Sequence, residues 1–439
     1  MINKYFYILI KVSVIAIMLS GNNIQAQSSG WFRTPGSPYT YAGFQDLYFI
    51  NPNTGWVINI EGPVFRTTNG GINWIMTDSI SPMASLLCVK FINENTGWIG
   101  TRNPNRQLFK TTNGGFNWTV ITNIPPPAVS GFQGMSLVGD SNIYLVGSDE
   151  APSYFTRSTN GGTIWQSINL GVHATVLFDC MFFSKDSGIA SGAIGNFVSE
   201  AICVVLFTSD GGVSWRNVFT GNRRKTLGWN MFFADRDLGY CAIESFSAPA
   251  DYLKTTNGGL NWEFKILRNS PGYHMLAIGF RNENTGWIGG NTDTTFRTTD
   301  GGNTWAYTGF GKNLNNFQFF GDSIGYCVGQ YVYKFDNTVG IKQVNTVIPN
   351  EYLLEQNYPN PFNPFTKISF SVPVALNSVK VKISVFNILG KEIRTLVNES
   401  LTSGNYEIEF DGSNLSSGVY FCKMESGKFL GIKSMILLK

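Results

Sequence analysis

The stretch Thr67-Thr68-Asn69-Gly70-Gly71-Ile72-Asn73-Trp74 decides the fold, because five more copies of it follow along the chain of 439 residues. The later copies end at Trp118, Trp165, Trp215, Trp262 and Trp305, so successive tryptophans stand 43 to 50 residues apart. A repeat of that length matches one four-stranded blade of a β-propeller. The sequence therefore predicts an all-β protein built from blades.

Each copy carries the residue types of a tight turn followed by an anchored strand. A Ser or Thr hydroxyl and an Asn or Asp side chain can hold local backbone groups. The glycine allows a positive φ, and the Trp is a large apolar anchor. The pattern resembles the Asp box, [S/T]-x-[D/N]-x-G-x-x-W, whose residues we expect to be structural. They are Thr67, Asn69, Gly71, Trp74, Thr111, Asn113, Gly115, Trp118, Ser158, Asn160, Gly162, Trp165, Thr208, Asp210, Gly212, Trp215, Thr255, Asn257, Gly259, Trp262, Thr298, Asp300, Gly302 and Trp305.

A second pattern gives the number of blades. A Phe followed by Asn-Thr-Gly-Trp precedes the boxes, most clearly at residues 49–56, 91–98 and 280–287, and predicts the first two strands of a blade. After the sixth box, residues 317–335 repeat three strands, but no further box follows. Gly30-Trp31-Phe32-Arg33 resembles the strand after a box, so we expect Trp31 to close a seventh blade and remove the open sheet edges. We predict a seven-bladed propeller over residues 27–335.

The N-terminus predicts export. Lys4 precedes an apolar stretch from Tyr5 to Leu19 that Lys11 interrupts, and the small residue Ala26 suits a cleavage site. Residues 1–26 are therefore interpreted as a signal peptide. The uninterrupted apolar part, residues 12–19, is too short to span a bilayer as a helix. The mature protein is expected outside the cytoplasm, with no transmembrane segment.

The composition changes after Phe335. Residues 336–355 are predicted to be a linker, and residues 356–439 a small Ig-like β-sandwich with turns at Gly390 and Gly418. Its entry, Pro359-Asn360-Pro361-Phe362-Asn363-Pro364, is held extended by the prolines. These residues, with the strand Gly418-Val419-Tyr420-Phe421, resemble the type A sorting domain of type IX secretion. The resemblance implies recognition by the type IX machinery and a secreted or cell-surface location.

The propeller itself resembles the photosystem II assembly factor family, which shares the pairing of TTNGGxxW with NTGW. That resemblance implies a binding platform without catalysis. Phe32-Arg33-Thr34-Pro35 also resembles an element of sialidases, but no further member of a sialidase arginine triad can be placed. The candidate acids Asp149, Glu150, Glu244 and Asp251 lie in segments between strands, where carboxylates are usually solvated. The alternative function is therefore an extracellular glycoside hydrolase of sialidase-like or xyloglucanase-like type.

Other classes of function find little support. A net charge of +3 gives no case for nucleic acid binding. The two histidines, His173 and His274, have no partners at ligand spacing, so neither a metal nor a cofactor is predicted. Six dispersed cysteines are expected to be small buried hydrophobes. A basic residue stands just before most boxes, and we expect it to pack against the blade, for example through a cation–π contact with a Trp. These residues are Arg66, Lys110, Arg157, Lys254 and Arg297, with Lys334 in the incomplete repeat. We predict a non-catalytic binding propeller for a protein or glycan, with recognition by its longer loops and no binding residue assigned.

Overall fold

The computed structural model describes residues 30–80, 85–102, 107–126, 131–147, 151–196, 199–247, 249–269, 274–291, 295–336, 342–345, 349–373, 379–412 and 415–438. The signal peptide predicted over residues 1–26 lies outside these ranges. Within them, every regular element is a β-strand. No helix in this part of the chain is long and apolar enough to cross a bilayer.

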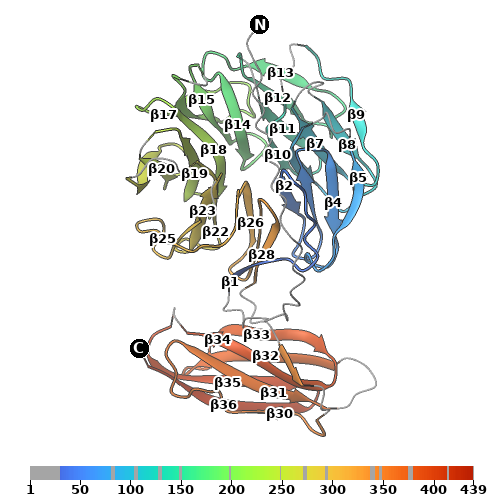
Figure 1. Cartoon of the computed structure of the whole chain (residues 1–439), viewed down its shortest axis with the longest axis vertical. Helices are drawn as coiled ribbons and strands as arrows, with labels where there is room; N and C mark the ends of the chain where they lie inside the picture. Colours follow the sequence, from blue (N-terminus) through green and yellow to red (C-terminus); the bar gives the residue numbers. More distant parts are fainter. Residues whose placement is uncertain are drawn as a thin grey trace, which may run out of the picture.

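Seven four-stranded antiparallel sheets surround a common axis and form the predicted seven-bladed propeller (Figure 1). Blade 1 contains β2 (Phe44–Phe49), β3 (Gly55–Asn59), β4 (Pro63–Thr67) and β5 (Ile75–Ser79). Blade 2 contains β6 (Leu86–Phe91), β7 (Gly97–Thr101), β8 (Leu108–Thr111) and β9 (Thr119–Ile121). Blade 3 contains β10 (Gly134–Val138), β11 (Asn142–Gly147), β12 (Tyr154–Ser158) and β13 (Gln166–Asn169).

The remaining blades follow the same order from the inner to the outer strand. Blade 4 contains β14 (Val176–Phe182), β15 (Gly188–Ile194), β16 (Ile202–Thr208) and β17 (Arg216–Thr220). Blade 5 contains β18 (Thr226–Phe233), β19 (Gly239–Ser245), β20 (Ala250–Thr255) and β21 (Glu263–Arg268). Blade 6 contains β22 (Met275–Phe280), β23 (Gly286–Gly290), β24 (Phe296–Thr298) and β25 (Ala306–Tyr307). Blade 7 contains β26 (Asn316–Phe320), β27 (Ile324–Val328), β28 (Val332–Asp336) and β1 (Gly30–Arg33).

The Phe that ends an inner strand joins neighbouring blades. Phe91 of blade 2 lies flat on Trp56 of blade 1, with 3.6 Å between ring centroids. Phe182 stacks in the same way on Tyr144, at 3.6 Å. The ring also covers the glycine that opens the next strand of its own blade, since a Cβ on Gly97 would lie 2.5 Å from the Phe91 ring. The glycine of the Asn-Thr-Gly-Trp pattern is therefore required by this close approach.

The N-terminal strand β1 closes the ring. It pairs antiparallel with β28, and Trp31 stands opposite Phe335 in the register. The Trp31 ring stacks on Phe310 at 5.2 Å and meets Trp287 edge-on at 5.6 Å. These contacts tie the outer strand of blade 7 to blade 6.

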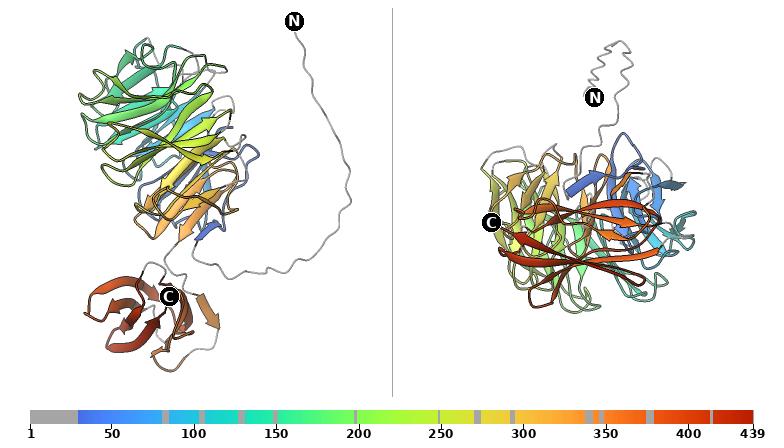
Figure 2. Two further views of the ribbon diagram at one scale, coloured as in Figure 1. Left: turned by 90° about the vertical axis from the view of Figure 1, so that its left-hand side faces the viewer. Right: turned by 90° about the horizontal axis from the view of Figure 1, so that it is seen from below.

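The C-terminal region is a sandwich of two four-stranded sheets. One sheet contains β29 (Lys342–Asn345), β34 (Gly404–Asp411), β31 (Phe365–Val372) and β30 (Leu353–Leu354). The other contains β33 (Glu392–Leu401), β32 (Val379–Asn387), β35 (Gly418–Ser426) and β36 (Phe429–Leu437). Figure 2 shows the sandwich beside the edge of the ring where β1 lies.

The predicted linker boundaries need correction. We expected residues 336–355 to connect the two domains, but β29 and β30 lie in that range and pair with β34 and β31. The physical reason is that such short strands are held by backbone hydrogen bonds to longer neighbours, which leaves little hydrophobic pattern to detect. Only residues 337–341 separate β28 from β29.

The proline-rich entry of the sandwich lies along the last strand. Asn360 accepts a hydrogen bond from the Ile436 amide at 2.8 Å, and Phe362 forms a parallel bridge with Leu437. Phe362 is buried in the core. Near the other predicted turns, Gly390 has a φ of 74°, and the Tyr420 hydroxyl donates to the Ser416 carbonyl at 2.8 Å. The entry motif is thus part of the folded sandwich.

Replacing Trp31 with alanine should lower the free energy of unfolding by about 3 kcal/mol, because a large aromatic side chain is lost from the closing contact. Trp31→Phe keeps a ring against Phe310 and should lose roughly half as much. The exposed Tyr307→Ala should change stability by less than about 0.5 kcal/mol. Urea denaturation of the three variants tests the prediction, and equal stability of Trp31→Ala and Tyr307→Ala would contradict it.

Candidate functional site

The residues of the six turn motifs hold one another rather than a ligand. In the first motif, the Thr67 hydroxyl accepts from the Gly71 amide at 3.0 Å and donates to Asn69 at 3.1 Å. Asn69 then accepts from the Asn73 amide at 2.9 Å. Gly71 has a φ of 84°. The same bonds recur in the other five motifs. The hydroxyl and the amide of Ser214 donate to Asp210, those of Thr304 donate to Asp300, and these bonds lower the pKa of both carboxyls to about 2.

The basic residues before the motifs join neighbouring blades. Lys110 lies 5.2 Å from the centre of the Trp98 ring, and its ammonium donates to the carbonyl of Gly161, in the motif of the next blade, at 3.2 Å. Arg157 donates to Gly211 in the same way, at 2.6 Å, and Lys254 to Gly301, at 2.7 Å. This column therefore combines cation–π contact with a carbonyl acceptor from the following blade.

The residues considered for sialidase chemistry are engaged in separate places. The Arg33 guanidinium stacks on Tyr331 at 3.8 Å, and Asp251 pairs with Arg223. Glu244 accepts from the Trp229 indole at 2.7 Å and contacts His274 at 3.0 Å. Asp149 and Glu150 lie outside the described residues. Where the chain is described, no three metal-binding side chains come together.

The cysteines have no disulfide partners. Cys88, Cys180, Cys203, Cys241, Cys327 and Cys422 are all buried with free thiols. Burial raises their pKa values, so they are inert small hydrophobes in this fold.

The central channel is a cavity of about 450 Å³ lined by the inner strands of all seven blades. Arg281 lines this channel as well as the cleft described below, and the charged groups on its other strands bind one another or backbone. Lys90 lies 3.8 Å from Asp46, whose carboxylate also accepts from the Val89 amide at 2.9 Å. Asp179 accepts from the Met231 amide at 2.8 Å, and burial raises its pKa to about 7. These contacts join successive inner strands and leave the channel a structural feature.

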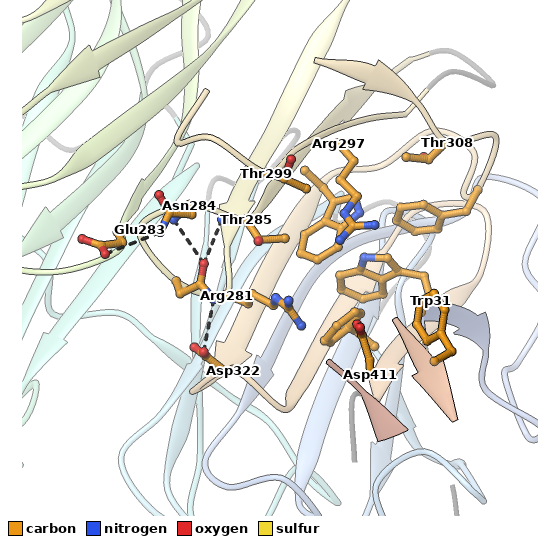
Figure 3. A pocket seen from close by; sticks show the side chains of 16 residues that line it. Trp31, Arg281, Glu283, Asn284, Thr285, Arg297, Thr299, Thr308, Asp322 and Asp411 are labelled. Atoms are coloured by element: carbon orange, nitrogen blue, oxygen red, sulfur yellow. Dashed lines mark hydrogen bonds between the residues drawn. The ribbon is translucent and has the colours of Figure 1, made fainter. Parts of the chain in front are cut away.

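A larger cleft of about 1120 Å³ opens at the edge of blades 6 and 7 (Figure 3). Its apolar walls come from four aromatic residues of the propeller, namely Trp31, Trp287, Phe310 and Phe335. Arg281 and Arg297 lie against these walls, 5.4 Å from the Phe335 ring and 5.8 Å from the Trp287 ring respectively. Phe365 and Asp411 of the sandwich complete the lining.

Neither of the two arginines forms an ion pair with a carboxylate within 4 Å among the described residues. The buried Nε of Arg281 has no hydrogen-bond partner in this part of the chain. Burial lowers the pKa of both, and Arg297 lowers that of Arg281 further. Arginine stays charged under such shifts. A buried donor on a cation favours a negatively charged oxygen from a ligand.

Acidic and amide groups line the cleft beside Arg281 (Figure 3). Asn282 accepts from the Asn284 and Thr285 amides at 3.1 and 2.8 Å, and it donates to Asp322 at 3.1 Å. Glu283 also lines this part of the cleft. The cleft therefore presents positive charge, negative charge, amides and aromatic faces together.

The cleft lies where the repeat is incomplete. In blades 2, 3 and 5, the basic side chain reaches a glycine carbonyl of the next motif. Blade 7 has no such motif, because β28 and β1 come from the end and the beginning of the propeller sequence rather than from one hairpin. Arg297 of blade 6 thus has no carbonyl to contact. The missing turn leaves both the space and the unused cation.

Sequence reasoning placed Arg297 in the packing column and did not single out Arg281, Phe310 or Asp322. A usable signal was present. Arg297 precedes the sixth motif and no seventh motif follows, which indicates a cation whose acceptor is missing. The side of the cleft formed by the sandwich depends on tertiary placement, which no local pattern contains.

The comparison with protein families identifies the C-terminal region. Residues 356–438 match the family model described as a secretion system C-terminal sorting domain. The predicted resemblance is confirmed for this part of the chain. The chain is therefore a propeller protein that carries a secretion sorting domain, which indicates a secreted or cell-surface location.

The propeller has relatives of known sequence and structure. It is 23% identical over 324 residues to the chloroplastic photosystem II stability/assembly factor HCF136 of Oryza sativa subsp. japonica, covering 65% of this chain and 76% of that protein. The solved structure of YCF48 bound to D1 peptide matches with a TM-score of 0.54 and 18% identity, over 71% of this chain and 98% of the other. YCF48 from Cyanidioschyzon merolae matches at 0.54 and 19%, over 70% and 99%.

A glycosidase shares the same fold. The GH74 xyloglucanase from Xanthomonas campestris matches with a TM-score of 0.53 and 11% identity, over 78% of this chain and 59% of that one. The propeller is similar in sequence to a photosystem II assembly factor, and at these identities the solved structures establish its fold alone.

Replacing Thr67 with alanine should lower the free energy of unfolding by about 1–3 kcal/mol, because the buried Gly71 amide loses its acceptor. Thr67→Ser keeps the hydroxyl and should stay within about 0.5 kcal/mol of the parent protein. The neighbouring exposed Thr68→Ala is the control. Thermal denaturation of all three variants tests the expectation, which fails if Thr67→Ala and Thr68→Ala melt together.

Asp179 should make stability depend on pH. Its folded pKa of about 7 lies above the ordinary value of 3.8, so the folded state binds more protons between these values and stability falls as pH rises. Asp179→Asn imitates the protonated side chain. We expect it to match the parent protein at pH 4 and to exceed it by about 1–3 kcal/mol at pH 8. Urea titrations at both pH values, with the exposed Asp140→Asn as control, test this, and parallel pH profiles for Asp179→Asn and the parent protein would refute it.

Proposed function

We propose that this protein is an exported, non-catalytic propeller that binds a peptide segment of a partner protein in the cleft of blades 6 and 7, through a carboxylate placed on Arg281 and Arg297. The observation that carries the proposal is the pair of arginines without a compensating ion pair, held against aromatic walls. An arginine offers paired donors to a carboxylate, and aromatic faces bind apolar side chains beside it.

The mixed character of the cleft favours a peptide over a polyanionic glycan. Glu283 and Asp322 line the same space as the arginines and would repel a chain of uniform negative charge. A peptide can place its carboxylate on the arginines, its amides near the Asn282 turn and its side chains on the rings. A YCF48 propeller of the same fold has been solved with a bound peptide, which supports this class of ligand.

Export fits this role. The sorting domain implies handling by the type IX machinery, and we propose that residues 1–26 serve as the signal peptide for the first membrane. A rigid ring with one open cleft then presents its binding site at the cell surface or in the medium.

The runner-up function is a glycoside hydrolase. It is favoured by the three carboxylates Glu283, Asp322 and Asp411 in one cleft and by the fold shared with a xyloglucanase. Release of reducing sugar from xyloglucan or sialosides by the full chain, abolished by Asp322→Asn, would replace the binding proposal with this one.

Binding is tested with the purified full chain and two fluorescein-labelled pools of degenerate hexapeptides. One pool ends in a free carboxylate and the other in an amide, and anisotropy reports binding. We expect the carboxylate pool to bind and the amidated pool to bind at least tenfold more weakly. Arg281→Gln and Arg297→Gln should each weaken binding about tenfold, since a hydrogen bond to a charged group contributes about 1.5–3 kcal/mol.

Arg224→Gln is the matched control, because Arg224 is an exposed arginine that pairs loosely with Glu200 at 3.5 Å, away from the cleft. It should bind the carboxylate pool like the parent protein. Equal binding of the two pools, or equal losses in the Arg224 and Arg297 variants, would reject the proposal.

A further inference from the structure

The sorting domain reaches the cleft at one corner of its sandwich. Phe365 begins β31 and Asp411 ends β34, and the two residues stand opposite each other in the register of these paired strands. Both line the cleft together with the arginines, and Figure 3 labels Asp411 there. The contact is made by a neighbouring domain, so it changes whenever that domain moves or is removed.

Asp411 acts on the same two cations that the ligand would use. Burial lowers the pKa of Arg297, and the negative charge of Asp411 raises it. At Arg281 burial, Arg297 and the sandwich residue Arg394 lower the pKa, while Asp322 and Asp411 raise it, so the effect of Asp411 is clearest at Arg297. Asp411 is only partly buried. Its attraction to the arginines is therefore weakened by solvent and salt, and the carboxylate of a ligand can replace it.

The chain keeps Asp411 near the cleft. Asp336, the last residue of β28, pairs with Gly30 at the edge of the cleft, and β29 begins six residues later at Lys342. A connection this short holds the sandwich at a high effective concentration beside the propeller. A weak contact is then occupied for much of the time without a large interface.

We propose that the sorting domain is an internal competitor for the peptide cleft, with Asp411 taking the electrostatic place of the ligand carboxylate. Displacement or removal of the sandwich then raises the affinity of the propeller for its partner. The inference rests on the proposed function for its biological meaning, while the contact itself can be tested separately.

The first test uses the full chain and the carboxylate-terminated peptide pool. Asp411→Asn should raise the affinity of the full chain for this peptide pool about threefold to fivefold, the range expected for a screened charge contact. Glu409→Gln is the matched control, because Glu409 points to the same side of β34 two residues earlier but does not line the cleft. It should change the affinity by less than about 1.5-fold.

The second test needs no ligand. Phenylglyoxal modifies the neutral guanidine, so a nearby carboxylate that favours the charged form slows the reaction. Mass spectrometry should show Arg297 modified at least about twofold faster in Asp411→Asn than in the parent chain or in Glu409→Gln. The rate in the parent chain should also rise with added salt.

The outcomes separate the two proposals. If the peptide pool binds through Arg297 but Asp411→Asn alters neither affinity nor modification rate, the competitor is refuted and the binding site stands. If no peptide binds but Arg297 reacts faster in Asp411→Asn, the contact is real and the proposed ligand is wrong. Equal modification rates in all chains overturn the inference whatever the binding result.

Discussion

The structure depends on one repeated aromatic contact, in which a Phe at the end of an inner strand lies on a ring of the preceding blade. Phe91 on Trp56 and Phe182 on Tyr144 show its geometry, and Gly97 shows what it requires. The Phe91 ring lies over Gly97 when it stacks on Trp56, so position 97 must have no side chain. Because each blade is fixed to the one before it, seven blades must meet at the ends of the chain, and β1 supplies the last strand.

The meeting point differs chemically from the rest of the ring. In blades 1 to 6 the third and fourth strands are joined by a glycine turn, and in blades 3, 4 and 6 a carbonyl of that turn accepts from the basic side chain of the previous blade. At blade 7 these strands come from the end and the beginning of the propeller sequence, so the turn is absent and the cleft takes its place. Closure and the candidate site are thus two results of one break in the repeat.

Much of the fold could be predicted from sequence because its information is local and repeated. The spacing of the tryptophans gives the blades, and the similarity of Trp31 to the residues after each motif predicts closure. The linker was predicted too long because the short strand β29 is defined by its backbone partner, β34. The cleft escaped prediction for a related reason: Arg281, Phe310 and Asp411 come from segments far apart in the chain, and only the folded arrangement brings them together.

Because the proline-rich entry pairs with the last strand, the folding of this part of the sorting domain depends on residues at its C-terminal end. Asn360 and Phe362 are held by Ile436 and Leu437, residues that a ribosome adds some 75 positions later. A truncated chain lacks the surface on which the entry rests and cannot present this part of the domain in its folded form. The proline-rich entry therefore reaches its folded position only after the final strand has been synthesised and has paired with it.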